Sequence, residues 1–396
     1  MSENSVRPPG PRLIYLAKGV RVFVSGLLSI VLPFYLTILG YGGLFLGLAL
    51  AAILAGNAFS NIAVMYLDAS VGRRRLLQSF SLLMVLAGAV LALTTSALLI
   101  IFACFVGNIS STGTEAGPFQ SIEAGTLPDL APAGASVKAF GKYNLIGYSS
   151  AALGQLASAG PGALGNSHLA FQAVFVGFGL AGAVLFGVYS RTRGLNSGHA
   201  VRPGLANLGP GARRDVTRLS ALFSLDALGG VFVTTYLLSI WFHSTYGLKL
   251  EALGSIFFVA SVAAAASTYG ASVISLRIGN LRTMVYTHLV SSGLLIMMGL
   301  AGSLALAVIF LFLRQSLSQM DVPTRQALMT EMFQREERVQ AYAVTNIARS
   351  TGSFVGGPVA AGILGLEAVA AVPFVGGGVK IAYDLLTFAS YRKKYR

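Results

Sequence analysis

Apolar runs of nearly equal length recur along the whole chain, separated by short segments in which Gly, Pro and charged residues gather. The hydrocarbon core of a bilayer is about 30 Å thick and a helix rises about 1.5 Å per residue, so roughly 20 apolar residues cross it. Runs of this length predict an all-α polytopic membrane protein with twelve transmembrane helices. The predicted spans are residues 13–39, 43–67, 76–96, 97–125, 139–160, 169–190, 217–243, 251–276, 283–302, 304–330, 339–364 and 366–391.

The composition indicates that lipid, and not a soluble core, covers these runs. Of the 396 residues, 55% are hydrophobic and 11% are charged, and the mean hydropathy is +0.72. A soluble protein of this length could not bury so much apolar surface. Connections as short as residues 40–43 and 94–96 predict antiparallel neighbouring helices joined by tight hairpins.

The net charge of +14 is distributed unevenly between the two sets of loops. In a soluble protein such a charge would suggest nucleic acid as a partner. Here, if the N-terminus is cytosolic, the outer loops hold essentially Lys249 alone, which is the positive-inside distribution of membrane proteins. We therefore predict a multi-pass protein of the cell (inner or plasma) membrane with both termini cytosolic and no nucleic-acid partner. The cytosolic cations are then Arg73, Arg74, Arg75, Lys138, Lys142, Arg191, Arg193, Arg202, Arg213, Arg214, Arg218, Arg277, Arg282, Arg335, Arg338, Arg392, Lys393 and Lys394.

Four short similarities relate the first half of the chain to the second at a nearly constant offset. The pairs are Asp68–Arg75 with Ser275–Arg282 (offset 207), Val22–Ser25 with Val231–Thr234 (209), Gly117-Pro118 with Val322-Pro323 (205), and Asn144 and Gly154 with Asn346 and Gly356 (202). Four matches in order indicate a duplicated six-span unit. We predict two pseudo-symmetric six-helix bundles, residues 13–190 and 217–391, with a cytosolic linker at 191–216 and cytosolic tails at 1–12 and 392–396.

The loop after the second span contains Asp68, Gly72, Arg73, Arg74 and Arg75. These residues resemble the signature G-x-L-a-D-R-x-G-R-R-x of the major facilitator superfamily, whose two halves are related by an axis along the membrane normal. The match departs at Val64, where Gly is expected, and has one extra residue before Gly72. The resemblance implies that these residues form a conformational latch of cytosolic salt bridges. Alternatively, the arginines only follow the cytosolic excess of cations.

A second motif lies in the eleventh predicted span. Residues 353–362 are similar to the superfamily's antiporter signature G-x-x-x-G-P-x-x-G-G, which diagnoses exporters when it lies in the fifth span. The fifth span here has Gly147 and Gly154 without a proline, so close helix packing through small residues is the favoured interpretation. Residues 321–325 and 346–350 are also similar to uncharacterised prokaryotic members, which indicates membership and no substrate.

Three ionisable residues fall near the predicted bilayer midplane. At about 1.5 Å per residue, Arg314 and Arg349 lie about 15 Å deep and Asp226 about 13 Å deep. Such charges are expensive unless they are paired or hydrated. Guanidinium groups bind carboxylate and phosphate in a bidentate manner, so the positive surplus predicts a substrate-binding site for a small organic anion. Alternatively, Asp226 and one arginine form a structural ion pair while the other arginine caps backbone carbonyls.

Proton coupling requires a group that exchanges a proton within the membrane. Glu115 has no basic neighbour on its own predicted helix, so we predict Glu115 or Asp226 as the proton carrier. Arg21 or Lys18 from the first span could instead neutralise Glu115, which would remove this argument.

Two other acid–base pairs have helical spacing. Asp321 and Arg325 are four residues apart, as are Lys380 and Asp384, so each pair is predicted to form a local ion pair. Structural neutralisation is the favoured interpretation of both pairs, and a proton relay is the alternative.

These features favour a secondary active transporter that works by alternating access, with proton coupling, a small-molecule substrate and the lipid bilayer as partner, and that acts as a monomer. No cofactor or metal site is predicted, because the Gly runs lack a P-loop pattern and no metal-ligand spacing appears. A membrane-embedded enzyme is disfavoured, since His168, His199, His243 and His288 lie at ends, in loops or singly. A sensor is disfavoured because the sequence shows no soluble signalling domain. A proton-driven exporter of amphiphiles and an organic-anion uptake symporter both remain open.

Overall fold

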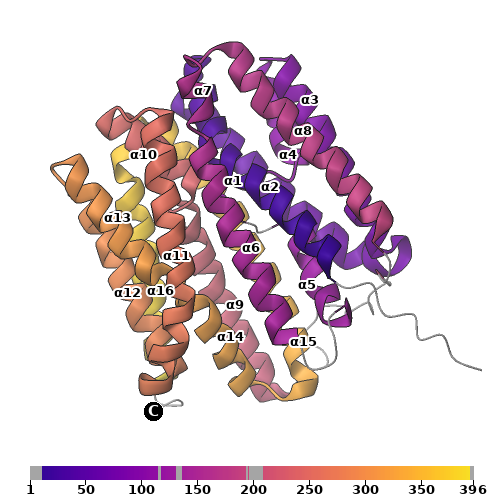
Figure 1. Ribbon diagram of the computed structural model, residues 1–396. Coiled ribbons are helices and arrows are strands. Elements are labelled where there is room, and N and C mark those ends of the chain that lie inside the picture. Colours follow the sequence, from indigo (N-terminus) through magenta and orange to yellow (C-terminus); the bar gives the residue numbers. More distant parts are fainter. Residues whose placement is uncertain (1–10, 115–116, 131–135, 193–194, 196–207, 393–396) are drawn as a thin grey trace, which may run out of the picture.

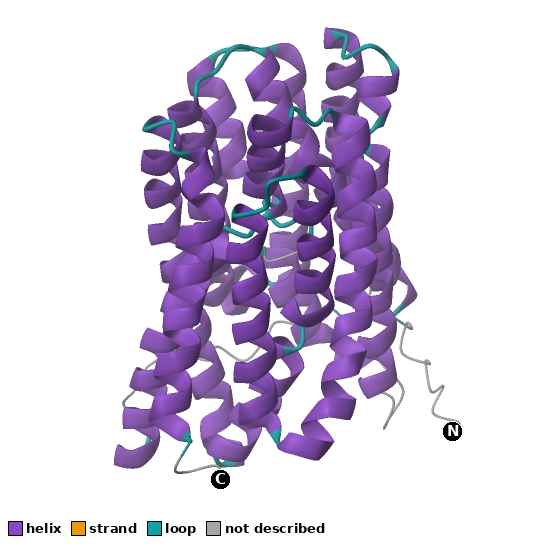
Figure 2. Cartoon of the chain, turned by 90° about the vertical axis from the view of Figure 1, so that its left-hand side faces the viewer, coloured by secondary structure: helices purple, strands orange, loops and turns teal. Residues whose placement is uncertain are grey.

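The computed structural model describes residues 11–114, 117–130, 136–192, 195 and 208–392. Within these residues every regular element is a helix (Figure 2). The α-helices are α1 (Arg12–Ile38), α2 (Gly43–Val71), α3 (Arg73–Leu93), α4 (Ala97–Val106), α5 (Pro118–Leu130), α6 (Ser136–Ala157), α7 (Gly160–Ala163), α8 (His168–Arg191), α9 (Pro210–Val231), α10 (Thr235–Tyr246), α11 (Leu250–Ile278), α12 (Asn280–Gly299), α13 (Leu304–Ser318), α14 (Asp321–Met332), α15 (Arg335–Gly365) and α16 (Val372–Tyr391), with the 3-10 helix η1 (Val369–Ala371).

The predicted all-α polytopic class is confirmed. Eight helical segments of the described chain are long and apolar enough to cross a membrane by length and composition. Each predicted span coincides with one helix or with two consecutive helices. Large apolar side chains point outward, with Leu93 83%, Leu98 77% and Leu276 89% exposed. Such an apolar exterior suits contact with lipid acyl chains and not with water.

Three predicted spans are interrupted, which corrects their description as continuous helices. Span 97–125 divides into α4 and α5, 217–243 into α9 and α10, and 304–330 into α13 and α14. In the first break Asn108 and Gly113 have φ values of 50° and 72°, which a right-handed helix does not contain. The breaks at α4–α5 and α9–α10 lie beside the cavity described below, where irregular backbone can be solvated. Helix α9 begins at Pro210, within the predicted linker at 191–216; residues 193–194 and 196–207 lie outside the described part.

The predicted repeat has a conformational counterpart at two glycines. Gly72 joins α2 to α3 and Gly279 joins α11 to α12, with φ values of 86° and 83°. Side chains other than glycine are strained at such angles, so both tight junctions require this residue. Arg73 then reaches Thr126 of α5 at 3.2 Å, and Asn280 reaches Glu331 of α14 at 2.6 Å. The two halves therefore repeat both the junction and its polar contact to a following helix.

The helices form two groups, α1 to α8 and α9 to α16. The two groups meet where α2 packs on α15 and where α6 packs on α11 (Figure 1). The first pair packs through small residues: a Cβ added to Gly47 would lie 2.2 Å from Cα of Ala361, and one added to Gly357 would lie 2.8 Å from Cα of Ala51. This close approach agrees with the packing interpretation of the motif at 353–362. In α6 and α11, Ser261 donates a hydrogen bond to Gln155 Oε1 at 2.5 Å.

The interrupted helices add hydrogen bonds between the groups. Tyr236 N donates to the carbonyl of Ser111 at 2.9 Å, and Thr235 Oγ1 donates to the carbonyl of Thr112 at 2.8 Å. The Tyr236 hydroxyl also donates to the carbonyl of Leu46 at 3.0 Å. The breaks therefore free backbone carbonyls that hold the two groups together.

Candidate functional site

A cavity of about 1070 Å³ lies between the two groups of helices. Its lining includes Arg21 from α1, Asn57 from α2, Arg314 from α13, Arg349 from α15 and Lys380 from α16. Most lining residues belong to those parts of the helices that lie nearer the start of α1 and the end of α16. Tyr236 contacts Ser111 at the edge of the cavity and Leu46 near the start of α2, whereas the lining residues of α2 lie toward its other end.

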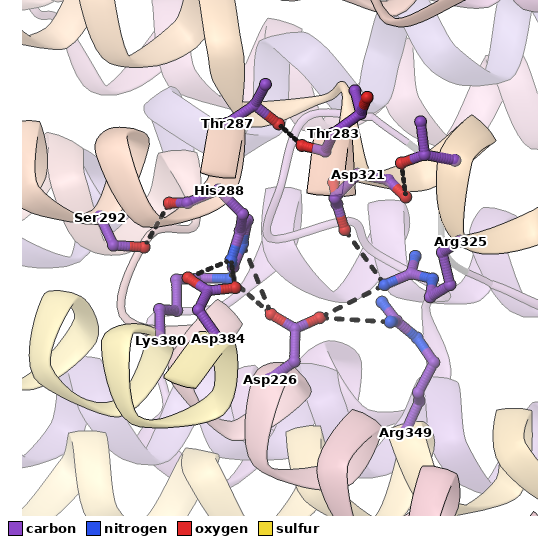
Figure 3. A network of polar contacts seen from close by, with 11 residues as sticks. Asp226, Thr283, Thr287, His288, Ser292, Asp321, Arg325, Arg349, Lys380 and Asp384 are labelled. Carbon is purple, nitrogen blue, oxygen red and sulfur yellow. Dashed lines mark hydrogen bonds and ion pairs between the residues drawn. The ribbon is translucent and has the colours of Figure 1, made fainter. Parts of the chain in front are cut away.

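Asp226 is the centre of a buried charge cluster in this cavity (Figure 3). It is 4% exposed. Its Oδ1 accepts a hydrogen bond from Lys380 Nζ at 2.8 Å. Its Oδ2 lies 3.3 Å from Arg349 Nη1 and 3.4 Å from Arg325 Nη1. Helices α9, α14, α15 and α16 thus place three cations on one carboxylate, an arrangement that favours its charged form.

Two further carboxylates complete the cluster (Figure 3). Asp321 Oδ2 lies 3.1 Å from Arg325 Nη1, so this predicted local pair is present. His288 of α12 places Nδ1 2.8 and 3.0 Å from the two oxygens of Asp384. With His288 neutral, three carboxylates then face the three cations of Lys380 and the two arginines, and the cluster has no net charge.

Arg314 lies in the same cavity but outside this cluster. It is 5% exposed. One of its guanidinium nitrogens donates to Gln315 Oε1, while Nε has no hydrogen-bond partner within the described structure. The predicted trio is thus brought into one cavity, with Asp226 and Arg349 in contact and Arg314 separate. A buried guanidinium with an unused donor is suited to bind an anion.

The other half of the molecule has its own buried ion pair. Arg21 donates to both oxygens of Glu123, at 3.1 and 2.6 Å. The hydroxyls of Tyr143 and Tyr189 donate to the same carboxylate at 2.8 and 2.7 Å. Arg21 also lies over the Phe119 ring, 4.8 Å from its centroid. Arg21 is therefore engaged by Glu123; the predicted proton carrier Glu115 lies outside the described residues.

The sequence interpretation missed the roles of His288 and Lys380. Lys380 was expected to pair with Asp384, but its ammonium binds Asp226 and lies 3.3 Å from His288 Nε2. His288 and Asp384 are 96 residues apart, so no local spacing reveals their contact. The one available signal was a histidine inside a predicted span, since ionisable groups at that depth are functional candidates.

The residues predicted as a conformational latch surround the α2–α3 junction. Arg73 Nε lies 3.3 Å from Asp68 Oδ2, and Arg73 also donates to Thr126 of α5. Arg74 donates to the backbone carbonyl of Ser190 in α8. Arg75 is exposed. Together with the φ of Gly72, these contacts tie the junction to two helices of the same half.

Comparisons with known proteins agree with this architecture. An uncharacterized membrane protein of Saccharomyces cerevisiae is 26% identical over 392 residues, covering 89% of this chain and 87% of that protein. The structure of a nucleoside transporter NupG mutant matches with a TM-score of 0.73 at 12% identity, covering 96% of this chain and all (100%) of that one. A D-xylose-proton symporter matches with a TM-score of 0.71 at 14% identity, covering 95% and 97%. At these identities the structures show a shared fold.

The sequence also matches a family model over most of its length. The model of the Major Facilitator Superfamily covers residues 14–357, which include the cavity-lining segments of α1, α2, α9 and α13. Because this match spans well over half of the chain, the chain belongs to the Major Facilitator Superfamily.

Proposed function

We propose that this protein is a proton-coupled secondary transporter that moves a small organic anion across the cell membrane by alternating access. The observation that carries the proposal is Arg314, a buried guanidinium in the central cavity whose Nε donor is unused among the described residues. Guanidinium is the side chain best suited to bidentate binding of carboxylate or phosphate.

The charge of the cavity supports an anionic substrate. The Asp226 cluster is internally neutral when His288 is neutral, so Arg314 adds a positive charge beside it. Within a low-dielectric site, such a charge attracts an anion more strongly than it would in water. Arg349 is 32% exposed at its side chain and faces the same space, so it provides a second contact for the substrate.

The wall of the cavity formed by the first half carries polar groups beside the cations Lys18 and Arg21. Asn57 donates through Nδ2 to the carbonyl of Ile109 at 2.9 Å, while its buried Oδ1 has no partner in the described structure. Ser110, Thr112 and Asn144 line the cavity nearby. An acceptor left free in this way suits a hydroxyl or amine donor on the substrate. These polar groups favour a substrate that carries hydrogen-bonding groups beside its negative charge.

The direction in which the cavity faces follows from the proposed orientation. With both termini cytosolic, the lining residues belong to the cytosolic parts of the helices, and the contacts of Tyr236 with Ser111 and Leu46 seal the outer side. Transport then requires that these outer contacts open while the cytosolic side closes, as the two halves rock about the cavity.

The test is ligand-dependent thermal stabilisation across a library of sugar acids, phosphorylated sugars, carboxylates and neutral sugars. We expect at least one anion to raise the unfolding temperature of the wild type and to lose this effect in Arg314→Ala, because bound ligand stabilises the folded state. Arg277→Ala is the matched control, since Arg277 is exposed and outside the cavity. The anion site is refuted if an anion stabilises all three proteins equally, or if only neutral sugars stabilise them.

A further inference from the structure

The two ring nitrogens of His288 face groups of opposite charge (Figure 3). Nδ1 lies 2.8 Å from Oδ1 of Asp384. Nε2 lies 3.3 Å from Lys380 Nζ and 3.7 Å from Asp226 Oδ1. His288 is 5% exposed and lines the cavity. It therefore stands between the central carboxylate, a cation and a second carboxylate, with access to the cavity.

These contacts define the neutral state of the ring. An ionised Asp384 only accepts hydrogen bonds, so Nδ1 carries the hydrogen and donates it. Nε2 then has a free lone pair and accepts a hydrogen bond from the Lys380 ammonium, which also donates to Asp226 at 2.8 Å. Lys380 thus bridges the histidine and the central carboxylate in this state.

We propose that His288 is the proton-binding residue of the transport cycle, and that its protonation displaces Lys380 from Asp226. This inference rests on the proposed proton-coupled transport and assigns the group that carries the proton. A hydronium ion in the cavity gives one proton to the Nε2 lone pair and becomes water; no other bond changes.

Protonation reverses the contact between His288 and Lys380. Nε2 loses its lone pair and becomes a donor, so the ammonium 3.3 Å away loses an acceptor and meets a like charge. Asp226 Oδ1, 3.7 Å from Nε2, is the nearest carboxylate oxygen on that side of the ring. The imidazolium takes the place of Lys380 on Asp226, and the released ammonium adds a cation for the anionic substrate.

The surroundings of His288 support this assignment over Asp226 itself. From α16 the ring meets Asp384, Lys380 and the Tyr383 ring, whose centroid is 5.7 Å away. From α9 it meets Asp226, through which Arg325 and Arg349 of α14 and α15 act on it. From α13, the Arg314 carbonyl accepts a hydrogen bond at 3.4 Å from Ser291, which lies three residues after His288 on α12. A proton on Asp226 would leave three cations without their shared anion, whereas a proton on His288 keeps Asp226 ionised.

The proton site is tested by nitrogen NMR of the full chain, labelled with ¹⁵N-histidine and held in lipid nanodiscs. The signals of His288 are those lost in His288→Gln. We expect the neutral form protonated at Nδ1 at high pH and the imidazolium after acidification within about pH 5 to 8, the range in which histidine serves as a switch. In Lys380→Met the change moves to higher pH, because a neighbouring cation opposing the proton is gone.

Two outcomes of this titration overturn the proposal. One is a His288 that keeps a single protonation state across the range in protein that remains folded. The other is a titration that Lys380→Met leaves unchanged, because Lys380 is then not coupled to the ring. Neither reading requires a known substrate, so the titration remains interpretable even if the anion proposal fails.

Transport in proteoliposomes supplies the second measurement, with the anion that the stabilisation screen identifies. We expect an inward-directed proton gradient to drive accumulation in the wild type, and His288→Gln to lose this stimulation. His243→Gln is the matched control, because His243 contacts the Leu248 carbonyl at 2.8 Å outside the cavity. Stimulation that persists in His288→Gln refutes His288 as carrier, whereas absence of anion transport by the wild type refutes the proposed function.

Discussion

The two halves of this transporter each bury a charge cluster, and the clusters are built differently. In the first half, Arg21 binds both oxygens of Glu123, and two tyrosine hydroxyls bind the same carboxylate. In the second half, Asp226 is shared by single nitrogens of Lys380, Arg325 and Arg349 from different helices. Each oxygen of Glu123 has at least two partners at or below 3.1 Å, whereas two contacts of Asp226 exceed 3.2 Å.

This difference indicates that the Arg21–Glu123 pair is structural, whereas the Asp226 cluster is able to rearrange. A bidentate pair with saturated oxygens has no second arrangement of similar energy, because every alternative leaves a buried donor or acceptor without a partner. The Asp226 cluster has several: Arg325 also binds Asp321, and Lys380 also contacts His288. Because a switch requires two arrangements of similar energy, we assign the switching chemistry to the second half.

The largest expected effect on stability comes from breaking the saturated pair. Glu123→Gln removes the charge that compensates the buried Arg21, and we expect a loss of about 3–5 kcal/mol in the free energy of unfolding. Thermal unfolding of the purified protein in detergent measures this loss. The double variant Arg21→Gln with Glu123→Gln is expected to recover part of it, because no uncompensated charge remains.

A contrary result would change the comparison itself. If Glu123→Gln left the unfolding temperature unchanged and abolished transport, the first-half cluster would be part of the transport machinery, and its saturated geometry would describe only one state of the cycle.

A smaller effect on stability is expected at the shared carboxylate. Asp226→Asn leaves three cations without their common anion, but they line the cavity and Arg325 keeps Asp321. We expect a loss of about 1–3 kcal/mol, the range for hydrogen bonds to charged groups, together with loss of transport. Adding Lys380→Met restores the charge count, so the double variant is expected to regain stability and not transport. Additive losses in thermal unfolding would show that the two residues are not coupled.

The sequence predicted the architecture better than the site because the two depend on different ranges of interaction. Hydropathy and loop charge report on the solvent around each segment, so the spans and the repeat at Gly72 and Gly279 could be inferred locally. Asp226 and Arg349 could be predicted as site residues because the depth of a residue in the bilayer follows from its position within its own span. The contacts of His288 with Asp384 and of Lys380 with Asp226 join different helices, and their residues are 96 and 154 positions apart. Helical spacing predicted that Lys380 pairs with Asp384, four residues away in the sequence. In the folded chain Lys380 instead binds Asp226.

The broken helices show a second limit of the same kind. An apolar run from 97 to 125 reads as one span, but the polar segment from Asn108 to Thr114 turns away from the helix and hydrogen-bonds to α10 of the other half. The run of Ser and Thr residues offered this signal, because such side chains compete for backbone hydrogen bonds. Its meaning depended on a partner that only the assembled bundle provides.

The smallest effect on stability is expected at Asp68, a carboxylate that is more exposed than those of the two buried clusters. Asp68 pairs with Arg73 at 3.3 Å, and their side chains are 19% and 16% exposed, so solvent screens the pair more than it screens Glu123. Asp68→Asn is therefore expected to cost about 0–1 kcal/mol in thermal unfolding. If the predicted latch operates, transport slows by more than this loss explains, because the junction biases one state of the cycle and not the folded state as a whole. Arg277→Ala, at an exposed position before the corresponding Gly279 junction of the second half, is the control. Equal transport rates in Asp68→Asn and Arg277→Ala would reduce the arginines after Gly72 to a signal of membrane orientation.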